Sequence, residues 1–315
     1  MLWDIAMVGL GLGVLLLAGD ALVKGAVNLS LRLGVPALIV GLTVVAFGTS
    51  APELLVSVKA VLVGAPALAL GNVVGSNTAN ILLVLGIPAL IAAVPVAREL
   101  MRDYAGMMAA TALFLGVAFL GPIRWPHALV LLAGLALMLG DAFLRARAHR
   151  SANETELEGA EPGMPWWRIG LYTGLGLVGL PIGAELLVDG SVAIARELGV
   201  SEAVIGLTLV AIGTSLPELA TTVMAALRRE AGVALGNVLG SNMFNLLGII
   251  GVAGLVGPIP VPAEMLTRDL WVMTAASALL AVFVLTGRPI TRVWGLGLTA
   301  LYAAYLAVLV LQGGA

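Results

Sequence analysis

The chain contains one polar stretch twice, and this duplication constrains its fold more than any other feature. Residues 48–53 read Gly-Thr-Ser-Ala-Pro-Glu, and residues 213–218 read Gly-Thr-Ser-Leu-Pro-Glu. Each copy is followed at the same distance by Gly-Asn-x-x-Gly-Ser-Asn, at 71–77 and 236–242. The two 40-residue segments that contain both signatures align without a gap and share 23 identical positions. Shared polar residues inside apolar segments indicate a site that is repeated in two related halves.

Composition places these segments in a membrane. Hydrophobic residues make up 60% of the 315 residues, charged residues only 11%, and the mean hydropathy is +1.08. Because a bilayer-spanning helix needs roughly 20 apolar residues, the chain can hold about ten. Apolar runs and their punctuation predict an all-α polytopic membrane protein of ten spans. We expect these spans near residues 2–31, 37–61, 66–93, 104–120, 127–144, 167–195, 202–226, 232–257, 270–286 and 293–312.

A polar, acidic linker divides the spans into two sets of five. We assign residues 1–144 to a first five-helix repeat, 145–166 to the linker and 167–315 to a second five-helix repeat. Because five is odd, the second repeat must cross the membrane in the opposite sense to the first. The duplication therefore predicts two inverted-topology repeats, a construction typical of secondary transporters.

The arginines predict the orientation of the chain. Arginine is concentrated in the cytoplasmic loops of membrane proteins. One set of alternate loops holds eleven arginines, against three in the other set, namely Arg124, Arg196 and Arg268. We therefore expect a multi-pass protein of the cell (inner) membrane, with a cytoplasmic linker and both termini external. The richer set is Arg32, Arg98, Arg102, Arg145, Arg147, Arg150, Arg168, Arg228, Arg229, Arg288 and Arg292.

Two acids lie near the middle of predicted spans. Glu53 is in the second span and Glu218 in the seventh, where inserting a carboxylate costs about 3 kcal/mol. Pro52 and Pro217 lack an N–H group and should leave the carbonyls four residues earlier without a donor. We therefore expect each helix to break at its Thr-Ser pair and to present bare carbonyls beside hydroxyls and a carboxylate. Unpaired backbone at this depth is tolerated only beside water or a ligand.

The polar groups around these breaks offer oxygen and no sulfur. Oxygen ligands suit hard cations, and calcium accepts six to eight of them. Two carboxylates would neutralise one divalent ion, and sodium could occupy the same oxygens one ion at a time. The chain has no cysteine, which excludes thiolate metal sites and disulfides. The candidate side chains are Glu53, Glu218, Thr49, Ser50, Thr214, Ser215, Ser76, Ser241, Asn80 and Asn245.

The two signatures resemble the alpha repeats of the sodium/calcium exchanger family of cation/calcium antiporters. The resemblance implies that Glu53 and Glu218 bind both calcium and sodium, and that Asn80 and Asn245 lie at the centre of the sites. It implies sodium ligands at Thr49, Ser50, Thr214, Ser215, Ser76 and Ser241, helped by the carbonyls of Ala46 and Ala211. It also implies that the first and sixth spans slide across the rest to alternate access.

The chain departs from the family pattern at two points. Many members carry Asp at one of the positions that Asn80 and Asn245 occupy here, so this site has two carboxylates rather than three. The linker of about twenty residues also lacks the large regulatory loop of animal members. The transported ions implied are Ca²⁺ and Na⁺, with H⁺ as an alternative, and no cofactor is expected.

Other functions fit the sequence less well. Calcium/proton exchange is the alternative within transport, since carboxylate pairs also carry protons. An intramembrane hydrolase would need a mid-span base beside a serine, and none exists, so an enzyme is not expected. A passive channel is disfavoured by inverted broken helices that converge on one site. The expected partners are the two ions and the lipid bilayer, with neither nucleic acid nor an obligate protein partner. On the first span, we expect Asp20 and Lys24 to pair at i, i+4 spacing.

Overall fold

The computed structural model describes residues 1–315 except 98–99, 149–160, 162, 200–210 and 314–315. Within the described residues every regular element is helical, apart from two isolated β-bridges. The first half contains α1 (Leu2–Leu33), α2 (Ala37–Val40), η1 (Gly41–Val45), α3 (Ala46–Thr49), α4 (Ala51–Leu62), α5 (Pro66–Ala79), η2 (Asn80–Val84), α6 (Gly86–Ile91), α7 (Met101–Phe119) and α8 (Trp125–Ala148). The second half contains α9 (Trp166–Glu197), α11 (Ala211–Gly213), α12 (Leu216–Leu227), α13 (Ala231–Met243), η5 (Phe244–Ile249), α14 (Ile250–Val256), η6 (Met265–Asp269), α15 (Leu270–Leu279), α16 (Ala281–Thr286) and α17 (Arg292–Gly313).

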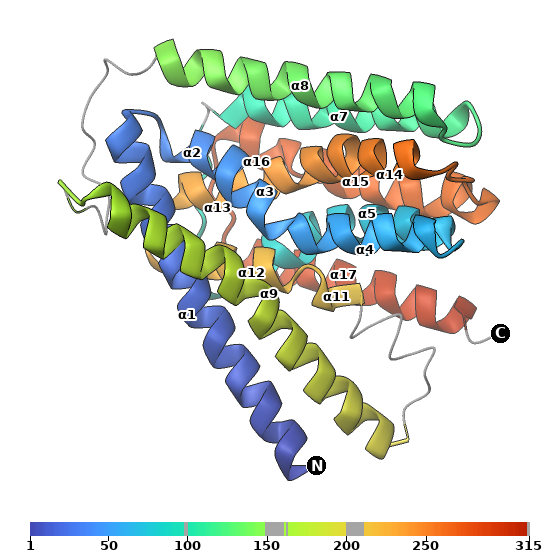
Figure 1. The fold of residues 1–315 in the computed structure, drawn as a ribbon, viewed down its shortest axis with the longest axis horizontal. Helices are drawn as coiled ribbons and strands as arrows, with labels where there is room; N and C mark the ends of the chain where they lie inside the picture. The colour runs from blue at the N-terminus through green and yellow to red at the C-terminus, as the bar shows by residue number, and fades with distance from the viewer. Residues whose placement is uncertain (98–99, 149–160, 162, 200–210, 314–315) are drawn as a thin grey trace.

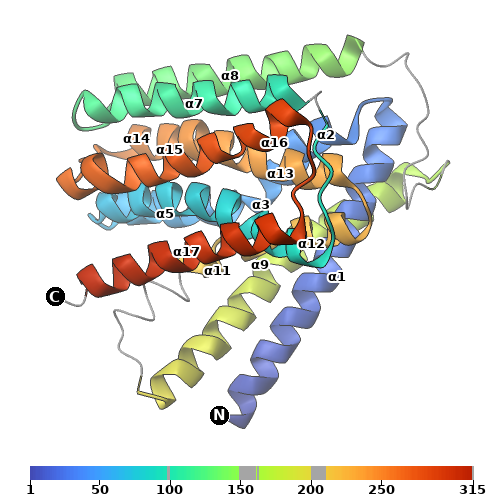
Figure 2. The ribbon, with the colours of Figure 1, turned by 180° about the vertical axis from the view of Figure 1, so that it is seen from behind.

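Two long helices stand apart from a central bundle. α1 and α9 run side by side and obliquely to the other long helices, which lie roughly parallel to one another (Figures 1 and 2). Glycines allow this pair to approach closely. A Cβ atom at Gly11 would lie 2.5 Å from the Leu187 nitrogen, and one at Gly176 would lie 2.4 Å from the Leu22 Cβ. Such contacts between small residues are the usual basis of helix packing in membranes.

The described helices confirm a multi-pass helical membrane protein. Seven are long and apolar enough to cross a bilayer, or eight if the bent pair α2–α4 counts as one span. The predicted spans near 104–120 and 202–226 correspond to α7 and to α12, and the residues before α11 lie outside the described part. Because neither α7 nor α12 is among the eight, the helix count does not confirm ten spans.

The predicted breaks at the Thr-Ser pairs are confirmed. α3 ends at Thr49, and α4 begins at Ala51 with an axis bent by 43°. Ser50, between them, has φ −86° and ψ 4°, outside the helical region. The second half repeats this geometry, because Ser215 has φ −90° and ψ 4° and lies between α11 and α12. Each break brings a hydroxyl and, three residues later, a glutamate to the same level of the bundle.

The expectation of bare carbonyls at the first break is wrong. Backbone N–H groups at the turn donate to the carbonyls of Ala46 and Gly48, and the Ser50 N–H lies 3.0 Å from the Ala46 oxygen. The turn tightens at Ser50 and so reaches donors that a straight helix with Pro52 would lack. The carbonyls are therefore bonded, although each oxygen keeps a second lone pair.

Two isolated β-bridges tie the halves together in a symmetric way. Val94 pairs with Ile290, and Ile123 pairs with Ile259, each through two backbone hydrogen bonds of 2.9–3.0 Å. The segment after α6 thus meets the segment between α16 and α17, and the segment between α7 and α8 meets the segment after α14. This reciprocity is what two related halves with a twofold axis between them would produce.

The predicted pair between Asp20 and Lys24 is wrong. Asp20 instead accepts from Arg228 at the end of α12, at 2.6 Å. Lys24 binds Glu161 in the linker, also at 2.6 Å. Asp20 and Lys24 therefore bind partners in other segments, because an i, i+4 pair contributes only a few tenths of a kcal/mol on its own. Within the linker, residues 149–160 and 162 lie outside the described residues.

Candidate cation site

The two predicted acids are buried between the halves. The exposed fraction of Glu53 is 1% and that of Glu218 is 0%. Among the described residues, neither side-chain oxygen of Glu53 has a hydrogen-bond partner, and Glu218 Oε2 has none. Buried carboxylate oxygens without donors are costly. Three such oxygens close together indicate a site for a cation or a proton.

Hydroxyls of both halves reach one of these carboxylates. Ser50 Oγ, in the first half, donates to Glu218 Oε1 at 3.0 Å, and Ser241 Oγ lies 3.5 Å from the same oxygen. The contact between Ser50 and Glu218 joins the break of one half to the acid of the other. The structure therefore brings together candidate residues that are 168 positions apart in the chain.

Other candidate oxygens share the isolation of the carboxylates. Four of the other candidate oxygens are buried and lack a hydrogen-bond partner in the part of the chain that the structure describes. These oxygens are Ser76 Oγ, Asn80 Oδ1, Ser215 Oγ and Asn245 Oδ1. Asn80 and Asn245 occupy equivalent positions in the two halves, whereas the equivalents of Ser76 and Ser215, namely Ser241 and Ser50, both contact Glu218.

The remaining candidates are placed as follows. Thr49 is 1% exposed, and its hydroxyl lies 3.4 Å from the Ala46 carbonyl of its own helix. Thr214 lies next to Ser215 and contacts Asn72 of the first half at 3.4 Å. Ala211 is the first residue of α11, and its side chain is outside the described part of the structure.

Sequence reasoning missed the role of the first asparagine in each Gly-Asn-x-x-Gly-Ser-Asn signature. Asn237 Oδ1 accepts a hydrogen bond of 3.1 Å from Thr49, and Asn237 Nδ2 lies 3.4 Å from the backbone carbonyl of Glu218. Asn72 makes the equivalent contacts with Thr214 and with the carbonyl of Glu53. The recurrence of this asparagine in both signatures was the available signal.

The last asparagine of each signature was also missed. Asn77 Oδ1 accepts from Asn245 Nδ2 at 3.2 Å, and Asn242 Oδ1 accepts from Asn80 Nδ2 at 3.0 Å. Each pair crosses between the halves and leaves the Oδ1 atoms of Asn80 and Asn245 without a partner among the described residues. Asn80 begins η2 and Asn245 lies in η5, and π-helical segments of this kind are frequent at functional sites.

The chemistry of the cluster is that of a hard-cation site. Its unpartnered atoms are carboxylate, hydroxyl and amide oxygens, which suit sodium, calcium and similar ions. The described residues contain no group of three or more His, Cys, Asp or Glu side chains that could hold a metal. The formal negative charge of the cluster is therefore limited to the two glutamates, enough to balance one divalent ion.

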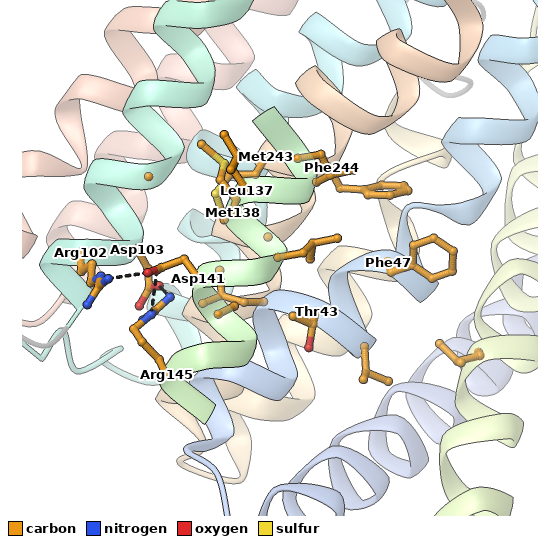
Figure 3. A pocket seen from close by; sticks show the side chains of 18 residues that line it. Thr43, Phe47, Arg102, Asp103, Leu137, Met138, Asp141, Arg145, Met243 and Phe244 are labelled. Carbon is orange, nitrogen blue, oxygen red and sulfur yellow. Dashed lines mark hydrogen bonds and ion pairs between the residues drawn. The ribbon is translucent and has the colours of Figure 1, made fainter. Parts of the chain in front are cut away.

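A separate cavity of about 780 Å³ lies beside α8 and contains none of the candidate residues. Its walls are apolar, and a charged network closes one end (Figure 3). Arg145 binds Asp103 at 2.6 Å and Asp141 at 3.0 Å, and Arg102 also binds Asp141. Two acids and two bases leave this network without net charge, so it does not compete as a cation site.

The fold defines a multi-pass helical membrane protein, with a cluster of buried oxygens between two related halves. The family model described as sodium/calcium exchanger protein matches residues 3–140 and 169–311, which include both halves. The chain belongs to the sodium/calcium exchanger family. Members of this family are transporters rather than enzymes, which fits the expectation of a protein without catalytic activity.

Relatives cover almost the whole chain. The putative antiporter CaxA of Alkalimonas amylolytica is 38% identical, with 94% of this chain and 95% of the relative covered. The sodium/calcium exchanger MaX1 of Methanosarcina acetivorans is 34% identical, with 95% and 96% covered. The inner membrane protein YrbG of Escherichia coli is 33% identical, with 98% and 97% covered.

Solved structures of one exchanger have the same fold. The sodium-calcium exchanger NCX_Mj, soaked with 2.5 mM Na⁺ and 1 mM Sr²⁺, matches with a TM-score of 0.82 and 32% identity. The match covers 96% of this chain and 97% of that chain. The resemblance inferred from the two signatures is confirmed.

Proposed function

We propose that this protein is a secondary antiporter that exchanges calcium for sodium at one acidic site in the middle of the membrane. The observation that carries the proposal is the pair of buried glutamates, Glu53 and Glu218, with three carboxylate oxygens unpartnered among the described residues. A buried anion without a donor requires a cation or a proton. The family and its exchanger relatives favour the cations calcium and sodium.

The proposed ligands occupy equivalent positions in the two halves. Both glutamates bind either ion, because two negative charges balance one calcium ion and the same oxygens can hold sodium. Since the two ions share acids, binding of one opposes binding of the other, and this competition makes the protein an exchanger. The hydroxyl and amide ligands are Thr49, Ser50, Thr214, Ser215, Ser76, Ser241, Asn80 and Asn245, with the carbonyls of Ala46 and Ala211.

Ten spans in two inverted repeats, residues 1–144 and 167–315 with the linker 145–166 between them, complete the proposed architecture. The reciprocal bridges between Val94 and Ile290 and between Ile123 and Ile259 support it. The end of α8 and the start of α9 lie at one end of the bundle, and the end of α17 lies at the other (Figure 1). This arrangement supports a cytoplasmic linker and an external C-terminus in the inner membrane, and the N-terminus is likewise external.

Alternating access requires a part of the protein that can move. α1 and α9 are suited to this role because they cross the bundle obliquely as a pair (Figures 1 and 2). They pack on each other through glycines such as Gly11 and Gly176, so they can move as one body. Sliding of this pair opens the site to one side of the membrane and closes it to the other.

Calcium flux into proteoliposomes tests the proposal. Sodium, potassium and proton gradients are imposed one at a time, and calcium movement is followed against its own gradient. We expect an outward sodium gradient to drive calcium uptake. Uptake driven by a pH gradient alone, with no effect of sodium, would establish the calcium/proton alternative. Uptake that needs no counter-ion would indicate a channel.

A further inference from the structure

Asn237 is held by its own half and reaches into the other. Its amide nitrogen lies 3.4 Å from the backbone carbonyl of Glu218 and 3.2 Å from Thr222 Oγ1, both in the second half. Its amide oxygen lies 3.1 Å from Thr49 Oγ1 in the first half. Asn237 is fully buried, so each of these polar contacts replaces a bond to water.

These contacts fix the direction of the hydrogen bonds. A backbone carbonyl can only accept, so the Asn237 atom that faces Glu218 must be the amide nitrogen. The atom that faces Thr49 is therefore the amide oxygen, which has no proton. It follows that Thr49 donates its only proton to Asn237 and keeps its oxygen lone pairs for another partner.

The same arrangement occurs on the opposite side of the site. The amide nitrogen of Asn72 lies 3.3 Å from the Glu53 carbonyl and 3.1 Å from Ser57 Oγ. Its amide oxygen is 3.4 Å from Thr214 Oγ1 in the second half. Each half therefore supplies an asparagine that is locked to its own glutamate and contacts the threonine of the other half.

Without Asn237, the Thr49 proton would turn to an atom of the cation site itself. The Ala46 carbonyl, a proposed sodium ligand, lies 3.4 Å from this hydroxyl. A hydroxyl that donates to this carbonyl uses a lone pair that a cation would otherwise take. The amide oxygen of Asn237, at 3.1 Å, draws the proton away from it.

We propose that Asn72 and Asn237 are positioning residues. Each one orients the hydroxyl of the other half's threonine so that its oxygen can bind sodium. This inference rests on the proposed function and adds how the two halves assemble one site. Neither asparagine contacts the ion itself, because each acts through Thr49 or Thr214.

A double-mutant cycle on sodium binding tests this role. Thr49→Val removes the hydroxyl and keeps the shape of the side chain, and Asn237→Ala removes its acceptor. The apparent sodium affinity is measured for the parent, both single variants and the double variant, from sodium competition with calcium binding by the purified protein. A parent that binds no sodium would contradict the proposed function, and only a sodium-binding parent tests this inference.

We expect Asn237→Ala to lower sodium affinity about fivefold in the parent, within the range of a single hydrogen bond. In the Thr49→Val background we expect less than a twofold further loss, because the hydroxyl that Asn237 orients is already gone. Thr49→Ser, which keeps a hydroxyl, should restore the full effect. A purely structural role for Asn237 predicts an equal loss in both backgrounds, and that result would overturn the inference.

A matched control comes from the other half. Asn72 contacts Thr214 rather than Thr49. The loss of sodium affinity in Asn72→Ala should therefore be the same with and without Thr49→Val, and it should be smaller in the Thr214→Val background. If Asn237→Ala does not fold, the equivalent cycle of Asn72→Ala with Thr214→Val tests the same role in the other half. Equal losses of sodium affinity in both Thr214 backgrounds would also overturn the inference.

Discussion

The hydroxyl of Ser50 in the first half donates to the carboxylate of Glu218 in the second, at 3.0 Å. The equivalent hydroxyl, that of Ser215, has no partner among the described residues. The two halves are therefore related in sequence but not equivalent in this structure. Glu218 has a donor on one oxygen and Glu53 has none on either. A hydrogen bond therefore stabilises the carboxylate of Glu218 and not that of Glu53.

This asymmetry predicts different effects for two equivalent substitutions. Ser50→Ala removes a proposed ligand and also the donor to Glu218, and a hydrogen bond to a charged group contributes roughly 1.5–3 kcal/mol. Ser215→Ala removes a proposed ligand only. We expect Ser50→Ala to weaken apparent calcium affinity by about tenfold or more and Ser215→Ala by less. Calcium titration of both variants checks this, and equal losses would count against a role for the hydrogen bond.

The linker is predicted to be cytoplasmic. The chain has no cysteine, so a single Ser151→Cys substitution reports the position of the linker, and Arg124→Cys provides a control in the connection between α7 and α8. In intact cells, an impermeant thiol reagent should label the cysteine at position 124 and not the one at 151. The reverse pattern would invert the orientation.

The ion pair between Asp20 and Arg228 joins α1 to the end of α12 at 2.6 Å. Because both side chains are about one-third exposed, the pair should contribute no more than about 1 kcal/mol to stability. If α1 moves during transport, this contact must break in the opposite access state. Asp20→Asn and Arg228→Gln should then change the exchange rate two- to fivefold with little change in thermal stability.

Reversal of both charges provides the control for this prediction. The double variant Asp20→Arg, Arg228→Asp keeps an ion pair between the two helices and should return the exchange rate toward that of the parent. Single variants with unchanged exchange rates would show that α1 does not separate from α12 in the transport cycle.

Glu161 provides a pH-dependent tie between the linker and α1. A hydrogen bond from Lys24 lowers the pKa of the Glu161 carboxyl below its ordinary value of 4.5. A lowered folded-state pKa stabilises the fold above the unfolded-state value, and this contribution is lost as the pH falls through the folded value. The parent should therefore unfold at a slightly higher temperature than Glu161→Gln at pH 7, and this difference should vanish below about pH 4. A difference that grows on acidification would contradict this assignment.

Much of the fold follows from the sequence because membrane helices must satisfy their backbone internally. The breaks at Ser50 and Ser215 could be predicted from proline chemistry. The bonded carbonyl of Gly48 could not, because it depends on how tightly the turn closes at Ser50. The predicted number of spans also exceeds what the described helices show, since α7 is not among the eight candidate spans and α12 is short and follows residues outside the described part.

Part of the candidate site was predictable, but its contacts and the roles of Asn72, Asn237, Asn77 and Asn242 were not. Duplication identified Glu53, Glu218 and their polar neighbours, since shared polar residues in apolar spans have few structural reasons to persist. The links across the halves, such as the one between Thr49 and Asn237, depend on how two distant segments pack. The prediction from i, i+4 spacing that Asp20 pairs with Lys24 was wrong, because each side chain binds a partner that is distant in the sequence.

The central claim is that Glu53 and Glu218 together carry calcium in exchange for sodium. Its most direct test is calcium uptake into sodium-loaded proteoliposomes by the parent, Glu53→Gln and Glu218→Gln. Each variant keeps the shape of the side chain and removes half of the charge that balances a divalent ion. Both variants should fold, because neutralising a buried acid lowers the free-energy cost of placing its side chain in the membrane.

We predict that the parent accumulates calcium only when sodium is inside the vesicles, and that both variants lose this uptake. A folded Glu53→Gln or Glu218→Gln variant with the calcium uptake of the parent would contradict the account.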